Sequence, residues 1–514
     1  MTAGATAPAQ GNSHVMSNES AQADQRRANL AAIEALGFPA YPHQFATTHT
    51  VAQLVEGYGA ADGATLEATR IDTTAAGRVL SIRSFGKASF LVLSDGQARL
   101  QVYVRQDVLT EREFGMAKLL DFGDIVGVAG YLFRTKSNEL SIWATSLTFL
   151  AKCYLPLPEK WHGLQDVETR YRQRYLDLIV NPEVRRVFEL RSRTVSAIRE
   201  ALTARGFLEV ETPMMQQIAG GALARPFVTH HNALDLKLYL RIAPELYLKR
   251  LVVGGIERVF EINRNFRNEG ISTQHNPEFT MLEFYWAYVD YETLMQFTEE
   301  LLSGVAEKVT GGVVCPFGEH EVSFAAPFRR LSLRHAAADE ASKRLGRAVT
   351  VDELRTLDGA AAVAKALHLE VPPGAGAGKI ATEIFERLWQ EHMVQPTFVY
   401  DFPTEVSPLS KQRADDPDTV ERFELYIGGF EVANAFSELN DPDEQRRRFE
   451  EQLVGKAKGD DEAHAMDEDY VRALEYGLPP TGGEGIGIDR LVMLLSNSLS
   501  IRDVILFPQM RPRE

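Results

Sequence analysis

Cysteine is scarce in this sequence, and long apolar runs do not occur in it. Cys153 and Cys315 are the two cysteines among 514 residues. They form no CxxC pair, which argues against a zinc site or a disulfide framework. No run of about 18 apolar residues appears, so we expect no membrane span. The first residues lack the basic and apolar segments of a signal peptide. These absences predict a protein of the reducing cytoplasm.

Positive charge is also in the minority. The chain has 55 Lys and Arg against 71 Asp and Glu, a formal net charge of −16, which taken alone argues against nucleic-acid binding. The segment from Ala75 to Leu155 differs, because ten Lys and Arg against seven Asp and Glu leave it at about +3 and the rest at about −19. This segment is the better candidate for contact with a polyanion, although the excess is small.

The length of 514 residues predicts two or three domains. We expect an N-terminal extension over residues 1–45, a β-rich domain over 70–155 and a large domain over 170–514. Residues 1–20, rich in Ala, Ser, Gln and Asn, are predicted to lack order. A short helix is expected over residues 24–38, where Leu30, Ile33 and Leu36 have helical spacing and Gly37 suits the end.

The β-rich domain has the pattern of a small barrel. Turn residues separate five runs of strand character: Gly77–Arg83, Ala88–Leu93, Leu100–Val104, Ile125–Phe133 and Leu140–Leu150. One helical run, Glu111–Leu120, lies between the third and the fourth. Five strands with a helix after the third match an oligonucleotide-binding (OB) barrel. An unrelated small β domain would give the same pattern.

The large domain begins with a helix and a strand. Apolar spacing predicts a long helix from Val187 to Arg205, ended by Gly206 and followed by a strand over Phe207–Val210. Residues 336–390 are rich in Ala and Leu and predict a helical insertion. The run that begins at Pro372 predicts a flexible break within it.

A polar hairpin over Arg258–Trp286 carries the first cluster of chemical groups. Its first strand alternates, so that Glu261, Asn263, Asn265 and Arg267 share one face. Its second strand places Phe279, Met281, Glu283 and Tyr285 on one face. A solvent-facing strand of a half-buried sheet is the alternative interpretation.

The segment Glu424–Glu438 carries the second cluster. Gly428-Gly429 is a hairpin turn signal that brings Glu424 and Glu431 near each other. Two close carboxylates repel, unless they share a divalent cation. Asn434, Phe436 and Glu438 share a face of the second strand. Two exposed acids on a hairpin are the alternative interpretation.

A Gly-rich segment, Gly482–Arg490, carries the third cluster. It is not GxGxxG and lies in no Rossmann unit, so it predicts a strand or turn that enters a helix. Arg490 at the helix start opposes the helix dipole, and a bound anion or ring would relieve this. An Arg paired with a surface acid is the alternative.

Three segments together resemble the signature motifs of the class II aminoacyl-tRNA synthetases. These are the helix and strand Arg191–Pro213, the hairpin from Phe266 to Phe279, and Gly485–Arg490. Within that class, the chain resembles most the bacterial-type lysyl-tRNA synthetases. This closer resemblance rests on three stretches: Gly220–Leu234, Arg241–Leu251 and Asn434–Asn440. One departure is Gln274, where many relatives have a basic residue that can touch the γ-phosphate of ATP.

The resemblance implies an α+β fold, with an N-terminal five-stranded OB barrel and a C-terminal class II domain built on an antiparallel sheet flanked by helices. It implies that lysine is activated with ATP and Mg²⁺ and attached to the 3′ end of tRNA(Lys) by a homodimer. The implied ATP-binding residues are Arg267, Glu269, His275, Asn276, Phe279, Glu424, Gly487 and Arg490. Arg267 and Arg490 are the implied catalytic residues, and Glu424 and Glu431 the implied metal ligands. The implied lysine-binding residues are Glu245, Glu283, Tyr285, Asn434, Phe436 and Glu438, and the implied anticodon-binding residues are Arg83, Phe90, Gln101 and Glu139.

Three alternatives stay open at this point. An aspartyl or asparaginyl synthetase shares the barrel and the sheet, but Glu245 and Glu438 are wrong for a pocket that binds a carboxylate. A catalytically silent paralogue would have lost Arg267, Glu424, Glu431 or Arg490, and all four are present. A relative that attaches lysine to a protein would not need the barrel. For Phe90, a position in the barrel core is the alternative to base stacking.

Overall fold

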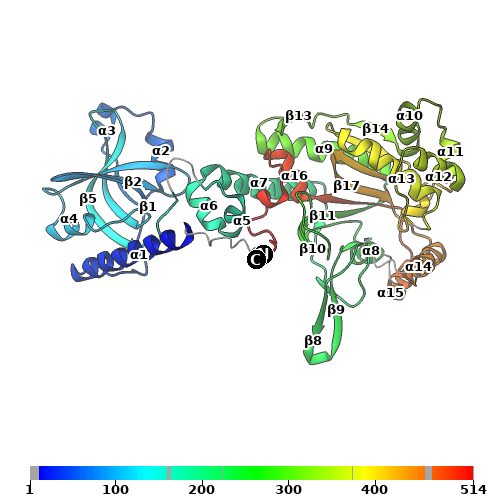
Figure 1. The fold of residues 1–514 in the computed structure, drawn as a ribbon, viewed down its shortest axis with the longest axis horizontal. Helices are drawn as coiled ribbons and strands as arrows, with labels where there is room; N and C mark the ends of the chain where they lie inside the picture. The colour runs from blue at the N-terminus through cyan, green and yellow to red at the C-terminus, as the bar shows by residue number, and fades with distance from the viewer. Residues whose placement is uncertain (1–10, 159–163, 223, 373, 458–465, 513–514) are drawn as a thin grey trace, which may run out of the picture. The chain divides into compact units, whose positions relative to one another are not determined.

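The computed structural model describes residues 11–158, 164–222, 224–372, 374–457 and 466–512. The chain divides into two compact units, Met1–Arg185 and Arg186–Glu514, whose elements are labelled in Figure 1. Among the described residues, no helix has the length and apolar character needed to cross a membrane.

The first unit contains a closed barrel of five strands in the order β1-β2-β3-β5-β4. Its strands are β1 (Asp72–Phe85), β2 (Ala88–Ser94), β3 (Arg99–Arg105), β4 (Ile125–Arg134) and β5 (Leu140–Ala151). Helix α4 (Glu111–Ala117) lies between β3 and β4 in the chain and has a capping box at Thr110. Every second residue of β2 and β3 is buried, as expected for strands that fill a barrel with one face. The predicted five strands and single helix are therefore confirmed.

The helices before the barrel differ from the prediction. Helix α1 spans Gly11–Ala35, so it is longer than the predicted short helix. Residues 1–10 lie outside the described part of the chain. Two further helices, α2 (Val51–Tyr58) and α3 (Gly63–Thr69), were not predicted. Leu30 and Ile33 are buried in the barrel's core cluster, which shows that packing on the barrel stabilises α1.

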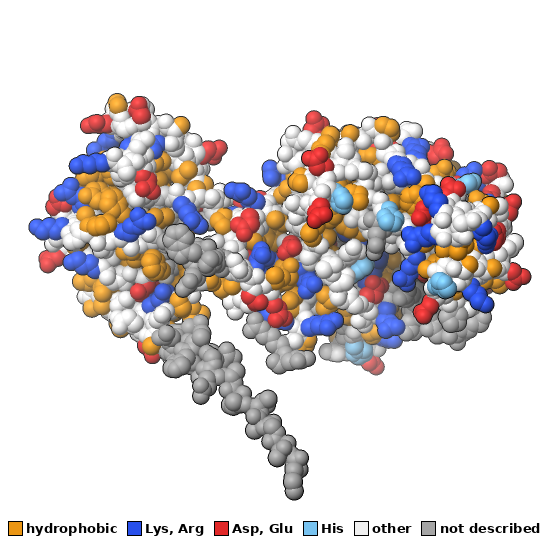
Figure 2. Space-filling model, turned by 45° about the horizontal axis from the view of Figure 1, so that its top comes forward, with side chains coloured by type: hydrophobic (Ala, Val, Ile, Leu, Met, Phe, Trp, Pro, Cys, Tyr) orange, Lys and Arg blue, Asp and Glu red, His pale blue; other side chains and the backbone are white. Residues whose placement is uncertain are grey.

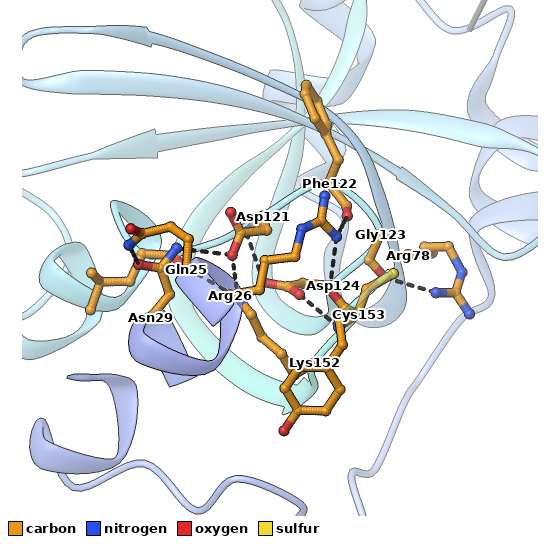
Figure 3. A network of polar contacts seen from close by, with 12 residues as sticks. Gln25, Arg26, Asn29, Arg78, Asp121, Phe122, Gly123, Asp124, Lys152 and Cys153 are labelled. Carbon is orange, nitrogen blue, oxygen red and sulfur yellow. Dashed lines mark hydrogen bonds and ion pairs between the residues drawn. The ribbon is translucent and has the colours of Figure 1, made fainter. Parts of the chain in front are cut away.

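A polar network ties α1 to the barrel (Figure 3). Arg26 donates to the carbonyl oxygen of Cys153 at 2.7 Å. Nearby, the fully buried ammonium of Lys152 lies 2.6 Å from Asp121 and 2.8 Å from Asp124. Because buried charges are stable only when paired, this network fixes where α1 meets the barrel. Helices α5 (Val167–Arg172) and α6 (Arg174–Val180) complete the first unit.

The second unit is built on an eight-stranded sheet with the order β14-β15-β16-β17-β18-β11-β10-β6. The strands are β6 (Leu208–Glu209), β10 (Arg258–Phe266), β11 (Glu278–Ala287), β14 (Arg329–Ser332), β15 (Thr397–Tyr400), β16 (Arg422–Ile427), β17 (Phe430–Ser437) and β18 (Thr481–Gly487). The outer pairs β14–β15 and β10–β6 are parallel, and the pairs between them are antiparallel. The antiparallel character of the sheet agrees with the prediction.

Helices flank this sheet, and two small sheets accompany it. The helices are α7 (Pro182–Ala204, which begins at the end of the first unit), α8 (Glu245–Val253), α9 (Tyr291–Thr310), α10 (Leu333–Leu345), α11 (Val351–Arg355), α12 (Leu357–Ala366), α13 (Ala377–Trp389), α14 (Pro442–Ala457), α15 (Glu468–Glu475), α16 (Ile488–Leu495) and α17 (Ile501–Val504). The small sheets are β12 (Val314–Phe317) with β13 (His320–Ser323), and β9 (Leu236–Leu240) between β7 (Met215–Gln216) and β8 (Val228–His231). Short 3-10 turns occur at Asn232–Leu234, Gln390–His392 and Thr404–Val406. Residues from α9 and α16 pack with the central strands in the largest hydrophobic core.

The predicted helical insertion is present as α10 to α13, which gather at one end of the second unit (Figure 1). These helices form a core of their own that includes Val399 of β15 and Tyr426 of β16. The predicted break falls between α12 and α13, and Pro373 lies outside the described residues. The segment is thus packed onto the edge of the sheet through its own core.

Candidate active site and nucleic-acid interface

The hairpin β10–β11 forms the middle of the site. Its polar face is buried, contrary to the solvent-facing alternative. Glu261 accepts hydrogen bonds from Arg241 at 2.7 Å and from Thr212 at 2.6 Å. The register pairs Glu261 with Glu283 and Val259 with Tyr285. The hairpin therefore positions Glu283 beside Glu261, whose carboxylate is held by internal hydrogen bonds.

A first cavity of about 270 Å³ lies over the central strands. The six residues implied to bind lysine all line it: Glu245, Glu283, Tyr285, Asn434, Phe436 and Glu438. Arg267, Glu424 and Glu431 line the same cavity. The structure therefore brings together side chains from α8, β11, β16 and β17 that are distant in the sequence.

A lysine that contacts two of these glutamates was not predicted from the sequence. The ammonium of Lys249, on α8, lies 2.5 Å from Oε1 of Glu245 and forms an ion pair with Oε2 of Glu438. Burial by itself lowers the pKa of Lys249, but the two carboxylates outweigh burial and raise that pKa well above its usual value. The side chain of Lys249 therefore stays charged. The spacing of four residues from Glu245 on a helix was a signal for this pair.

Glu438 has an oxygen available for a ligand. Its side chain is fully buried, and Oε1 has no hydrogen-bond partner among the described residues. Gly483 makes room for this oxygen, because a Cβ there would lie 2.1 Å from it. Burial raises the pKa of Glu438 well above its usual range. A buried carboxylate oxygen without a donor is costly, and a bound cation would satisfy it.

Glu283 is also buried, but it has a hydrogen-bond donor of its own. The Tyr285 hydroxyl donates to it at 2.7 Å. Burial and the charge of Glu245 nevertheless raise the pKa of Glu283 to about 8. At pH 7 this carboxyl group is mostly protonated until a cation arrives.

A second cavity of about 230 Å³ adjoins the first. It is lined by seven of the residues implied to bind ATP, Arg267, Glu269, His275, Asn276, Phe279, Gly487 and Arg490, and by Gln274. The guanidinium of Arg267 lies 5.1 Å from the centre of the Phe279 ring. Arg490, in the first turn of α16, approaches Nε2 of His275 at 3.2 Å. Burial, followed by the charge of Arg490, lowers the pKa of His275, so the neutral ring can accept this bond.

Asn276 is less available than the prediction assumed. Its amide donates to the carbonyl oxygen of Glu278 at 2.6 Å, and its side-chain oxygen accepts from the backbone N–H of Gln509 at 3.1 Å. Both ends of the side chain are therefore engaged, and Asn276 shapes the cavity wall as well as lining it.

The two cavities meet at a shared set of residues: Arg267, Met281, Glu431, Asn434 and Gly485. Arg267 is the cation of this set, and its Nε has no hydrogen-bond partner in the described part of the chain. Burial lowers its pKa. A guanidinium held without a full set of acceptors is suited to an anion placed where the cavities join.

The β16–β17 hairpin turns at Gly428 and Gly429, which have φ values of +66° and +84°, as the turn signal predicted. A bulge shifts the register, so that Glu431 faces Tyr426, and Glu424 faces Asn434. Glu424 accepts from Arg422 at 2.5 Å and from the Tyr426 hydroxyl at 2.6 Å. The two carboxylates line one cavity, as predicted, but Glu424 also has partners of its own.

Negative charge accumulates near this hairpin. Burial raises the pKa of Glu424, and the neighbouring Glu431 adds to this. Burial and the charge of Glu424 likewise raise the pKa of Glu386, on α13, to about 7. Among the described residues, no group of three or more acidic, His or Cys side chains could hold a metal by itself. The donor set suits an ion that takes one or two carboxylates and completes its shell with other oxygens.

The barrel of the first unit carries the candidate nucleic-acid interface. Arg83 faces Phe90 across β1 and β2, and the amide of Gln101 donates to Glu139 at 3.1 Å. Phe90 is half-buried and stacks on Tyr103 at 4.6 Å between ring centres, so it lies on the outer face rather than in the barrel core. Three of the four predicted residues therefore lie on the neighbouring strands β1, β2 and β3, and Glu139 directly precedes β5.

Further aromatic residues on this face were missed in the sequence. Tyr103 contacts Trp143 edge-on at 5.2 Å, and Trp143 stacks on Tyr131 at 6.0 Å. Arg70 lies over Tyr131 and Arg105 over Trp143. Figure 2 shows hydrophobic side chains bordered by several Lys and Arg on this unit, at the left of the view. A row of rings with flanking cations is suited to unpaired bases.

Comparisons with known proteins agree with this geometry. Residues 166–511 match the family described as tRNA synthetases class II (D, K and N), and residues 73–150 match the family described as OB-fold nucleic acid binding domain. The chain is 54% identical over 490 residues to the heat-inducible lysine–tRNA ligase of Escherichia coli strain K12, which covers 95% of this chain and 96% of that protein. It is 53% identical over 491 residues to the lysine–tRNA ligase of Carboxydothermus hydrogenoformans, with 95% and 98% covered.

Proposed function

The chain belongs to the class II tRNA synthetases of the D, K and N group, and we propose that it is a lysine–tRNA ligase that forms lysyl-adenylate and charges tRNA(Lys). The observation that carries this proposal is the meeting of two cavities at Arg267. One cavity offers carboxylates for an ammonium, and the other offers Arg and aromatic groups for a nucleotide. The reacting carboxylate and phosphate would meet at the junction.

In the first step, the α-carboxylate of lysine attacks the α-phosphorus of ATP. A carboxylate oxygen–phosphorus bond forms, the bond to the β-phosphate oxygen breaks, and pyrophosphate leaves. Arg267 would bind the α-phosphate and stabilise its developing charge. Because this chemistry depends mainly on positioning and charge, a fixed guanidinium between the two substrates is the central requirement.

The second cavity would hold the nucleotide. Glu269, His275 and Asn276 would bind adenine, and Phe279 would stack on it. Arg490 would lie on the other side of the base and reach the γ-phosphate, with Gly487 allowing close approach. Gln274 provides no second cation there, so the phosphate tail would depend on Arg490 and the metal.

The first cavity would select lysine. Glu245 and Glu438 would bind the side-chain ammonium, with the Tyr285 hydroxyl beside them, and Phe436 would pack on the methylene stem. Glu283 and Asn434 would hold the α-amino group. An amino acid without the ammonium would leave buried carboxylates unpaired, which is strongly unfavourable.

Glu424 and Glu431 would hold Mg²⁺ together with ATP phosphate oxygens. The concentration of negative charge around them supports this, as does the preference of magnesium for a few carboxylates plus phosphates and water. When bound, the ion would neutralise charge on the phosphates.

In the second step, the 3′ hydroxyl of the terminal tRNA ribose attacks the carbonyl carbon of the adenylate, and AMP leaves. The barrel would recognise the anticodon: Phe90 would stack on a base, while Arg83, Gln101 and Glu139 would read base edges. We also propose a homodimer through the segment Arg191–Pro213, since closed twofold contacts are the commonest oligomers.

Amino-acid-dependent ATP–pyrophosphate exchange tests the function directly. Lysine should support exchange, and aspartate and asparagine should not. Exchange without charging of tRNA would favour transfer of lysine to another acceptor, and exchange with aspartate or asparagine would favour the sister enzymes. No exchange with any amino acid would favour a silent paralogue.

A further inference from the structure

Lys249 occupies a cage that the proposed function does not use. Its ammonium meets two carboxylates, those of Glu245 and Glu438. Three aromatic rings surround it, with centres at 5.4 Å (Phe436), 5.9 Å (Tyr470) and 6.0 Å (Tyr285). The glutamates proposed to receive the substrate ammonium therefore already hold an ammonium that belongs to the protein.

Lys249 is not among the residues that line the first cavity, so it leaves that cavity open. Glu245 and Glu438 line the first cavity, whereas the side chain of Lys249 is fully buried behind them. Lys249 uses Oε1 of Glu245 and Oε2 of Glu438. Oε1 of Glu438, beside Gly483, remains without a hydrogen-bond donor among the described residues. Each glutamate thus contacts Lys249 through one of its two carboxylate oxygens.

The charge of this group decides what it can bind. With both carboxylates ionised, the two carboxylates and the one ammonium sum to −1, so one further monovalent cation makes the group neutral. Without Lys249, the sum would be −2 in a buried site. Two such carboxylates cannot both stay ionised, and one would take up a proton.

We propose that Lys249 is a specificity-determining residue, a resident counter-ion that holds Glu245 and Glu438 in place and sets the pocket to receive one ammonium group. This inference rests on the proposed function and adds to it the residue that fixes the charge of the pocket. Lys249 acts through the two glutamates and does not touch the substrate, so its role is positioning.

A charge-compensation cycle tests this. Glu438→Gln leaves Glu245 balanced by Lys249, so the group has a charge of 0, and L-lysine should bind about tenfold to a hundredfold more weakly, as when a charged hydrogen bond is lost. Adding Lys249→Met to this variant removes the ammonium that balances Glu245, so the group again has a charge of −1. The double variant should therefore bind lysine about tenfold more tightly than Glu438→Gln. Lys249→Met alone should bind more weakly than the unmodified protein, because Glu245 and Glu438 then lose the ion pairs that hold them in place.

Isothermal titration with L-lysine and, separately, with ATP gives the affinities, and melting temperatures report folding. ATP affinity should be unchanged in all variants. If the double variant is unfolded, Glu245→Gln with Lys249→Met provides the same comparison. Lys152→Met is a matched control, since Lys152 is also a fully buried lysine between two carboxylates, and it should lower stability without changing lysine affinity.

The inference is tested by whether lysine affinity rises or falls when Lys249→Met is added to Glu438→Gln. If Lys249 were only structural, removing it from the Glu438→Gln variant would weaken lysine binding further, and that result would overturn the inference while leaving the proposed function intact. Failure of the unmodified protein to bind lysine would overturn the proposed function itself.

Discussion

Lysine affinity should depend on pH through Glu283. In the free protein, burial and the charge of Glu245 raise the pKa of Glu283 to about 8, against the opposing effects of the Tyr285 hydroxyl and Lys249. If Glu283 receives the α-ammonium of lysine, it must be ionised in the complex. Binding then releases a proton, so affinity rises as the pH rises towards 8 and levels off above it.

The magnitude follows from the pKa. Below pH 8, each pH unit adds about 1.4 kcal/mol to the cost of ionising Glu283. Because about half of Glu283 is already ionised at pH 8, the change between pH 8 and pH 6 is about 2.3 kcal/mol, or a Kd about fiftyfold weaker. Other charged groups that interact with Glu283 are Glu245, Lys249, Glu261, Glu438 and Arg267, and they should not remove this slope.

Calorimetric titration of lysine without ATP, at several pH values and in buffers of different ionisation enthalpy, measures both the affinity and the proton released. Glu283→Gln should bind lysine weakly and with little pH dependence over the same range. Tyr285→Phe should move the midpoint to higher pH, because the hydroxyl favours the ionised carboxylate. A flat profile in the unmodified protein, or an unchanged slope in Glu283→Gln, would refute this reasoning.

Four further predictions follow from the site and the fold. Glu431→Gln should nearly abolish lysine-dependent pyrophosphate exchange without lowering the melting temperature; near-normal exchange at ordinary magnesium would remove Glu431 from the metal site. Phe90→Ala should leave exchange unchanged but raise the KM for tRNA about fivefold to a hundredfold, the cost of one stacked base; unchanged charging would exclude the proposed stacking. Burial raises the pKa of Glu484 to about 8, so its contribution to stability is complete below pH 4.5 and is lost as the pH rises to 8. Urea unfolding should show a loss of up to about 1.4 kcal/mol per pH unit in this window, and a slope unchanged in Glu484→Gln would contradict it. Sedimentation should show a dimer, and an active monomer at working concentration would refute the assembly through Arg191–Pro213.

Local signals in the sequence predicted much of the fold. Alternation along β2 and β3 predicted barrel strands because a strand with one face in a core must alternate. The turn at Gly428-Gly429 was predictable because both residues adopt positive φ, which glycine allows without strain. The sequence signal for the Gly-rich strand that leads into α16 was equally local. These features depend on neighbours in the chain, so the sequence alone contains their cause.

Other features depended on contacts that no local pattern contains. The place where helix α1 meets the barrel depends on Arg26, which donates to the carbonyl oxygen of Cys153 in a distant segment. The polar face of β10 is buried rather than exposed, because Arg241 and Thr212 from other segments hydrogen-bond to Glu261. In both cases, distant residues decided the outcome.

The sequence by itself determined which chemical groups the site has, because the motif residues and their order already predicted a class II synthetase and a lysine-binding set. Only the tertiary structure decided how those groups share charge. The helical spacing of Glu245 and Lys249 was visible from the start, but an exposed ion pair of that kind contributes little. Folding brings Glu438 to the same ammonium and removes water from all three groups. In that environment charges cannot be screened, so the balance among these side chains sets what the pocket can bind.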